Sequence, residues 1–218
     1  MKNNLEILYE DNHIIVVVKP FNILSQSDDT KDIDMLTLIK SYLKEKYNKP
    51  GNVYLGLVHR LDRPTGGIMV FAKTSKAASR LSEQIRLNLF TKKYLAIVNG
   101  YLSEKSGVFE DYILKKEDNS SIISKDGKYA KLEYEVLKEK SNLSLVNILL
   151  HTGRHHQIRV QFASRNHPLY GDQRYGKASK KQLALFAYYL SFNHPVTKEK
   201  LEFIKYPDKV GIWKEFIC

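Results

Sequence analysis

The chain has 218 residues, of which 43% are hydrophobic and 27% are charged, and its formal net charge is +11. This composition is typical of a folded globular protein with one large or two small domains, and it excludes a disordered tail. Because Cys218 is the single cysteine and neither a signal peptide nor a membrane-spanning run is recognisable, we expect a soluble, cytoplasmic protein without internal disulfides.

The first half of the chain predicts strands and helices in turn. A β-branched run at 14–18 has the composition of a strand. Asp34 has the position of a helix N-cap, and apolar residues recur at helical spacing over 35–43. A second strand is predicted at 68–72, followed by an amphipathic helix whose apolar face extends over 75–89.

The second half of the chain is rich in predicted strands. A buried strand is expected at 94–98, and the alternating pattern at 132–136 is repeated at 143–149. The segment 156–163 fits a helix and a strand equally well, whereas 183–192 has the composition of a strand. Closely spaced alternating strands favour antiparallel pairing. We therefore predict an α+β fold with a mixed, largely antiparallel sheet flanked by helices.

A Pro/Gly turn at 59–67, with the sequence His-Arg-Leu-Asp-Arg-Pro-Thr-Gly-Gly, places Asp62 between Arg60 and Arg63. Such a turn presents its carboxylate at a surface or in a cleft, and the flanking guanidinium groups favour the ionised form. Taken alone, the motif fits a hairpin tip whose aspartate caps its own turn. It equally fits a nucleophile or base that acts on a polyanion.

Three later segments are dense in chemically useful side chains. Residues 92–100 place Tyr94 beside two lysines, 150–159 carry three histidines and two arginines around a glycine, and 167–172 form a compact His-Pro turn. No carboxylate or cysteine accompanies these histidines at metal-ligand spacing. The sequence therefore predicts no metal site in this region.

Together, and in this order, the four segments resemble the RluA-type family of pseudouridine synthases. Its signature, His-Arg-Leu-Asp-x-x-Thr-Ser-Gly, is followed by Lys-x-Tyr-x-Ala, Gly-Arg-x-His-Gln-Ile-Arg and His-Pro-x-x-Gly-Asp. The resemblance extends from about Leu5 to Phe203, and Gly66 stands where the family usually has a serine that could hold the loop or contact a phosphate. It implies the pseudouridine synthase fold with a central cleft. It also implies one catalytic domain over 1–218, without an additional N-terminal RNA-binding module.

The reaction implied by this resemblance is isomerisation of uridine to pseudouridine within an RNA chain. Asp62 corresponds to the essential carboxylate, which attacks the anomeric carbon, attacks carbon 6 of the base or deprotonates the sugar. Each of these routes requires an ionised carboxylate close to the reacting atoms. Arg159 corresponds to the arginine that pairs with this aspartate, and Tyr94 to the tyrosine that stacks on the base.

The expected partner is structured RNA, either rRNA or tRNA. Residues 151–218 hold 12 Lys/Arg against 5 Asp/Glu, an excess that is typical of a nucleic-acid binder and also of a plain solvated surface. We expect Arg60, Arg63, Arg154 and His156 to hold the RNA backbone or to fill the space of the unstacked uracil. No cofactor is expected, because the isomerisation conserves oxidation state and the chain has no Gly-rich phosphate loop. We also expect a monomer.

Two other classes of function also use parts of this pattern. A glycoside- or nucleoside-cleaving hydrolase needs a carboxylate at a glycosidic carbon, but it usually needs a second one, where this motif has arginines. A catalytically inactive RNA-binding domain of the same fold would explain the basic charge. That alternative gives no reason for Asp62, Tyr94 and Arg159 to occur together.

Overall fold

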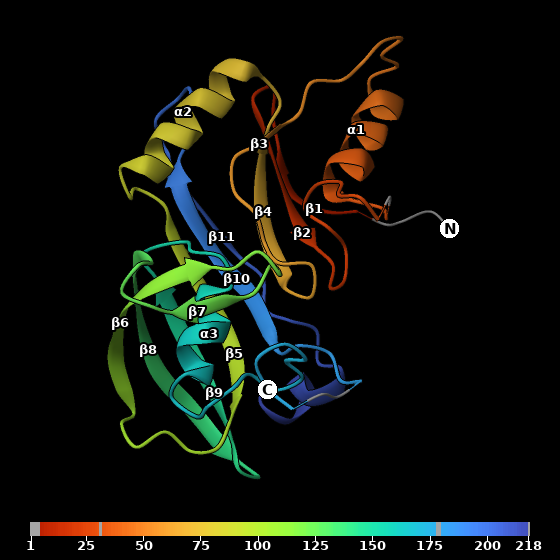
Figure 1. Ribbon diagram of the computed structural model, residues 1–218. Helices are drawn as coiled ribbons and strands as arrows, with labels where there is room; N and C mark the ends of the chain where they lie inside the picture. Colours follow the sequence, from red (N-terminus) through yellow and green to blue (C-terminus); the bar gives the residue numbers. More distant parts are fainter. Residues whose placement is uncertain (1–4, 31, 178–179, 218) are drawn as a thin grey trace. The chain divides into compact units, whose positions relative to one another are not determined.

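The computed structural model describes residues 5–30, 32–177 and 180–217 (Figure 1). The chain folds into two compact units. The first, unit 1, comprises Met1–Phe90 and Tyr188–Lys205, and the second, unit 2, comprises Thr91–Ala187 and Tyr206–Cys218. Unit 1 therefore combines the first part of the sequence with a segment near its end, and unit 2 combines the middle of the sequence with its last residues.

Unit 1 is built on antiparallel strands. The bounds of the first four strands are β1 Glu6–Glu10, β2 Ile14–Lys19, β3 Gly56–Leu57 and β4 Gly66–Ala72. They are ordered β1-β2-β4, and β3 pairs with β4. Strand β10, Leu185–Asn193, begins in unit 2 and continues in unit 1, where it pairs with β11, Lys200–Ile204. The strands predicted at 14–18, 68–72 and 183–192 are thus confirmed.

The two helices of unit 1 begin where side chains cap them. Helix α1, Met35–Lys46, begins after Asp34, whose carboxylate accepts the Thr37 N–H at 3.1 Å, as predicted. Helix α2, Ser75–Arg86, is capped by Thr74 in the same way. The prediction that Leu89 belongs to the apolar face of α2 is wrong, because the left-handed Asn88 ends the helix and Leu89 is exposed.

The core of unit 1 lies on both faces of its strands. Ala77 and Leu81 of α2 pack against alternate residues of two strands, namely Ile14, Val16, Ile68, Val70 and Ala72. The intervening residues of β2 and β4 are equally buried, and Figure 1 shows α1 on the side of these strands away from α2. Because both faces are covered, β2 and β4 appear in the sequence as continuous apolar runs.

Unit 2 contains a second antiparallel set of strands. Its strands are β5 Thr91–Asn99, β6 Ser106–Lys115, β7 Ser121–Ile123, β8 Lys128–Lys140 and β9 Leu143–Leu150. They are ordered β5-β9-β8-β6-β7. The short helices are α3, Gln157–Ala163, and the 3₁₀ helix Gly211–Glu215. The predicted α+β fold with largely antiparallel strands is therefore confirmed.

The segment 156–163, for which the sequence favoured neither a helix nor a strand, forms helix α3. Every residue of Gln157–Phe162 is buried, polar residues included, so burial along the helix does not follow the apolar pattern of the sequence. Val160 packs with Ile113 and Ala130, and the Phe162 ring lies 5.0 Å from the Phe109 ring. Helix α3 is therefore held firmly on strands β6 and β8.

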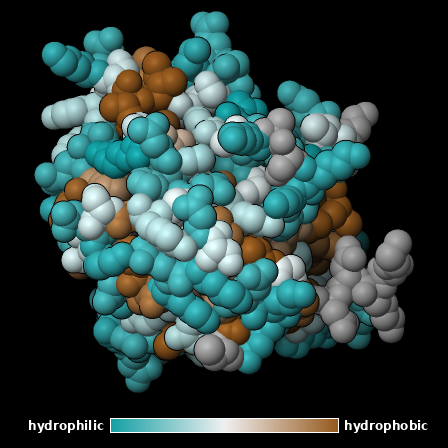
Figure 2. Space-filling model, turned by 90° about the horizontal axis from the view of Figure 1, so that it is seen from below, coloured by the Kyte–Doolittle hydropathy of each residue, from teal (hydrophilic) through white to brown (hydrophobic). Residues whose placement is uncertain are grey.

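Hydrophilic side chains cover most of the face shown in Figure 2, and apolar side chains form small, separate groups there. Among the residues that the structure describes, no helix is long and apolar enough to cross a membrane.

Candidate active site

Asp62 lies on the loop that joins β3 to β4 in unit 1. The side chain is half-buried, and the neighbouring Leu61 is buried. The Thr65 N–H donates to the Asp62 carbonyl at 2.9 Å, which closes the turn predicted from the Pro/Gly motif. The main chain of this turn is thus constrained, and the side chains of Lys19, Ser25 and His59 constrain the loop further.

Lys19 at the end of β2 anchors the loop through its side chain. Its buried ammonium group donates to the carbonyls of Pro20, Ile23 and Arg63 at 3.0, 2.6 and 3.0 Å. Burial lowers the pKa of Lys19 to about 7, while the Asp62 carboxylate opposes this shift. Three acceptors require three N–H donors, which only the protonated amine supplies. In its ammonium form, Lys19 therefore places a positive charge near Asp62 and fixes the loop backbone.

Ser25 anchors the same loop at Leu61. Its buried hydroxyl donates to the Leu61 carbonyl at 2.8 Å and accepts the Leu61 N–H at 3.1 Å. His59 contributes a further hydrogen bond, because its Nε2 accepts the Val70 N–H of β4 at 3.1 Å. Residues on both sides of Arg60 are thus tied to fixed parts of unit 1.

The two predicted RNA-binding arginines of this loop differ in their surroundings. Arg60 is exposed. Arg63 forms an ion pair with Asp32 at 2.8 Å, in which both side chains are about half-exposed. Exposed pairs of this kind contribute little to stability, so the Arg63 guanidinium can exchange Asp32 for another anion at small cost.

In unit 2, Arg159 of α3 is held in a buried ion pair. Its Nε and one terminal nitrogen donate to the two carboxylate oxygens of Asp172, both at 2.8 Å. Burial would raise the pKa of Asp172, but the hydrogen bonds from Arg159 outweigh it, and the pKa lies below its ordinary value. The N–H groups of Arg174 and Tyr175 also donate to this carboxylate. This bidentate geometry fixes the plane of the Arg159 guanidinium.

A network of hydrogen bonds surrounds Arg159. Its guanidinium lies over the Tyr175 ring, 5.2 Å from the centroid. Tyr175 Oη accepts the Ser121 N–H at 2.7 Å and lies 2.8 Å from His156 Nδ1. Burial raises the pKa of Tyr175, so its hydroxyl keeps the proton that it can donate to His156. The His155 ring lies against the His156 ring with centroids 3.8 Å apart and planes inclined by 32°.

The loop before α3 is held by the first residue of the helix. Gln157 Oε1 accepts hydrogen bonds from the Thr152 hydroxyl at 2.8 Å and from the Arg154 N–H at 3.0 Å. The Arg154 side chain in turn donates through Nε to the Tyr129 carbonyl at 2.8 Å. Arg154 and His156, both predicted to bind RNA, are thus parts of an ordered loop.

Tyr94 lies on β5 of unit 2, where it is buried opposite Ile148 of β9. Lys92 occupies the same face of the strand two residues earlier, and burial lowers the pKa of its amine. The sequence showed two lysines beside Tyr94 but did not indicate that Lys92 is the one with a lowered pKa.

The structure thus collects the predicted residues into two groups. Asp62, Arg60 and Arg63 share the loop of unit 1, and the remainder belong to unit 2: Tyr94, Arg154, His156 and Arg159. Sequence reasoning missed the residues that hold them, namely Lys19, Ser25, Asp172 and Tyr175. Asp172 had a signal, because it ends the His-Pro turn at 167–172. Among the described residues, no group of three or more His, Cys, Asp or Glu side chains is arranged to hold a metal ion.

Comparison with known proteins identifies the family. The family model described as RNA pseudouridylate synthase matches residues 13–164. The chain is 32% identical over 219 residues to ribosomal large subunit pseudouridine synthase C of Buchnera aphidicola (subsp. Schizaphis graminum), covering 93% of this chain and 68% of that protein. It is also 32% identical over 223 residues to tRNA pseudouridine synthase C of Haemophilus influenzae, covering 90% of each. The chain belongs to the RNA pseudouridylate synthase family.

A solved structure agrees with this assignment at the level of the fold. Human RNA Pseudouridylate Synthase Domain Containing 4 superimposes with a TM-score of 0.79 at 23% identity, covering 94% of this chain and 89% of that one. As an RNA pseudouridylate synthase of the RluA type, the chain is an isomerase, and the resemblance seen in its motifs is confirmed. The matched segment contains Asp62, Tyr94 and Arg159, whereas Asp172 lies beyond it.

Proposed function

We propose that this RNA pseudouridylate synthase converts specific uridines of structured rRNA or tRNA to pseudouridine, with Asp62 as the essential carboxylate. The observation that carries this proposal is the loop of Asp62, whose main chain is held by the buried Lys19 and Ser25. A carboxylate on a constrained turn beside a buried cation suits chemistry that requires an ionised and positioned group. The names of the relatives support both classes of RNA.

In this reaction the bond from the sugar to nitrogen 1 of uracil breaks, and a bond from the same carbon to carbon 5 forms. Nitrogen 1 gains a proton and carbon 5 loses one, so oxidation state and composition are unchanged. Asp62 acts on the anomeric carbon, on carbon 6 or on the sugar proton, and its ionised form is needed on each route. In its ammonium form, Lys19 places a positive charge near this carboxylate.

Two residues of unit 2 are proposed to serve the same reaction. Tyr94 stacks on the uracil and assists removal of the proton from carbon 5, as the motif implies. Arg159 orients the catalytic carboxylate, a task that suits a guanidinium whose plane is already fixed by Asp172. Arg60, Arg63, Arg154 and His156 are proposed to hold the RNA while the uridine is unstacked.

The replacement Asp62→Asn tests the central assignment. Amide and carboxylate are nearly equal in size, so we expect an unchanged melting temperature and complete loss of pseudouridine formation in total RNA from a strain lacking the gene. Asp126→Asn, at an exposed loop position of unit 2, is the matched control and should retain full activity. A folded Asp62→Asn variant with near-wild-type turnover would refute the role of Asp62. RNA binding without turnover by the wild type would instead support the inactive RNA-binding domain.

RNA binding should depend strongly on salt concentration, because basic residues that contact phosphates release counterions from the RNA. Residues 151–218 carry an excess of 7 Lys/Arg over Asp/Glu, which is where we propose most of these contacts. Titrating a ribosomal RNA fragment at several salt concentrations gives the slope, and a flat slope would show that this excess is only a solvated surface. We further propose that residues 1–218 act in the cytoplasm as one catalytic domain and as a monomer.

A further inference from the structure

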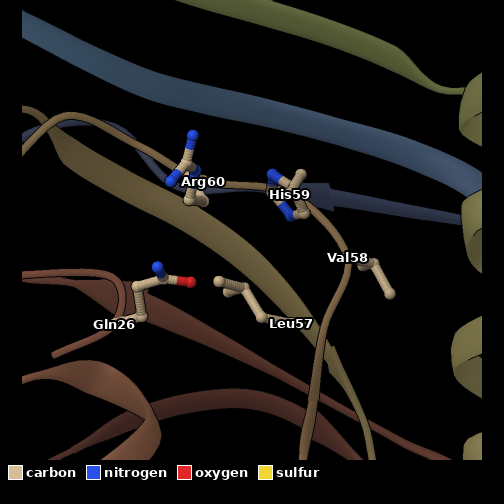
Figure 3. Close-up of a pocket in the computed structure, with 5 residues that line it drawn as sticks. All are labelled: Gln26, Leu57, Val58, His59 and Arg60. Carbon is tan, nitrogen blue, oxygen red and sulfur yellow. The ribbon is translucent and has the colours of Figure 1, made fainter.

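A pocket of about 280 Å³ lies beside the Asp62 loop in unit 1. Five residues line it: Gln26, Leu57, Val58, His59 and Arg60. Figure 3 shows that Gln26 comes from one segment and the other four from the end of β3 and the loop after it. Asp62 itself does not line this pocket, but His59 and Arg60 of the same loop do, so the pocket is a subsite next to the catalytic residue.

The pocket is built on fixed backbone. Ser25, next to Gln26, exchanges two hydrogen bonds with Leu61, next to Arg60, so the two segments that frame the pocket are locked together. The Leu24 carbonyl accepts the Met35 N–H at 2.8 Å, which ties the first segment to the start of α1. The side chains of Gln26 and Arg60 are therefore presented on a preformed frame and need no rearrangement of the backbone to bind a ligand.

The lining offers three different kinds of contact. The exposed Gln26 amide has a carbonyl that accepts and an NH₂ group that donates, which together match one edge of a nucleobase. Leu57, which points toward Gln26 in Figure 3, provides a small apolar surface for the face of a ring, whereas the Val58 side chain packs into the core of unit 1. The exposed Arg60 provides a cation for a phosphate. Edge, face and phosphate are the three features that one unpaired nucleotide presents.

Size and position favour a nucleotide that is part of the substrate. The volume lies just below the range of about 300–1,000 Å³ typical of pockets for drug-sized ligands, so it suits a single base. Arg60 is two residues from Asp62, and their Cα atoms are therefore no more than about 7.6 Å apart. A base held here would belong to a nucleotide next to the uridine at Asp62.

We propose that this pocket binds the base of a nucleotide that flanks the modified uridine, with Gln26 reading the base edge and Arg60 holding the phosphate. The inference rests on the proposed function and adds to it a determinant of site choice. It assigns different roles to the two side chains: Gln26 discriminates among bases at one position, whereas Arg60 strengthens binding of every sequence alike.

The test uses purified protein comprising residues 1–218 and a library of RNA stem-loops with one central loop uridine and randomised flanking positions. Pseudouridine in the products is mapped by sequencing. We expect wild-type products to be enriched in one base at one flanking position. We expect Gln26→Leu to reduce that enrichment about tenfold, as for loss of a bidentate base contact. Arg60→Ala should lower the yield at all sequences while keeping the base preference.

Controls separate this inference from the proposed function. Asn52→Leu removes an exposed amide of unit 1 that does not line the pocket, and it should keep both yield and preference. If the wild type forms no pseudouridine on any member of the library or on total RNA, the proposed function fails. If pseudouridine forms but Gln26→Leu keeps the wild-type preference at every flanking position, the pocket does not read a base and the inference is wrong.

Discussion

The two units hold their functional side chains in contrasting ways. In unit 1, Lys19 and Ser25 form hydrogen bonds to the backbone of the loop that carries Asp62. In unit 2, Asp172 instead binds the side chain of Arg159 through both carboxylate oxygens. A backbone anchor positions a turn and whatever side chain it carries, whereas a side-chain anchor fixes one guanidinium and its charge. The two regions should therefore respond differently to mutation.

The largest effect is expected where the buried ion pair is broken. Asp172→Asn leaves the buried Arg159 opposite a neutral amide, and we expect the free energy of unfolding to fall by about 3–5 kcal/mol. Urea unfolding at pH 7 measures this loss. Because the pKa of Asp172 is lowered, the wild type keeps the contribution at neutral pH and loses it as the pH falls through that lowered value.

A surface ion pair of the same unit provides the control for Asp172. Glu139 pairs with the exposed Lys105 at 2.7 Å, and Glu139→Gln should cost no more than about 1 kcal/mol. Equal losses of unfolding free energy in Asp172→Asn and Glu139→Gln would show that the buried pair stabilises the chain no more than an exposed pair does. The side-chain anchor of unit 2 would then not differ in strength from a surface contact.

The next effect concerns the pH dependence that Lys19 gives to unit 1. Its pKa is about 7 in the folded chain but about 10.4 in an unfolded one, so the unfolded state binds more protons between these values. The stability of the wild type relative to Lys19→Met should therefore rise between about pH 7 and pH 10, by at most about 1.4 kcal/mol per pH unit. Parallel pH profiles of the two proteins would mean that the three carbonyls keep Lys19 protonated throughout.

These anchors also show what the sequence could and could not predict. Buried β-branched runs and capped amphipathic helices were found because their patterns are local, as in 14–18 and around Asp34. Helix α3 was left open because its apolar residues fit a helix and a strand equally well, and the structure buries the polar residues between them too. The motifs indicated Asp62 and Arg159, but the partners of a buried charge are set by tertiary contacts. Nothing in the sequence near Lys19 distinguishes it from an exposed lysine, which is the usual state of that residue.

A smaller effect is expected at Ser25, and it separates stability from activity. Ser25→Ala removes two hydrogen bonds and leaves polar groups of the buried Leu61 unpaired, which should cost about 1–3 kcal/mol. Because the Asp62 loop loses an anchor, pseudouridine formation should also fall. Ser144 is a buried serine of unit 2 whose hydroxyl donates to the Gly100 carbonyl at 2.8 Å. Ser144→Ala should lose similar stability but keep its activity when assayed well below its melting temperature.

The smallest effect is expected at Thr65, on the same loop. Its hydroxyl is buried and has no hydrogen-bond partner among the residues that the structure describes. Valine has the same shape, so Thr65→Val removes a buried polar group without breaking a hydrogen bond, and stability should be unchanged or up to about 1 kcal/mol higher. Urea unfolding of Thr65→Val and Ser25→Ala measures the two changes in the free energy of unfolding. It compares a buried hydroxyl without a hydrogen-bond partner among the described residues with one that forms two hydrogen bonds. A loss at Thr65 as large as that at Ser25 would contradict the view that this loop is held through its backbone, because the Thr65 N–H bond to the Asp62 carbonyl is kept in the variant.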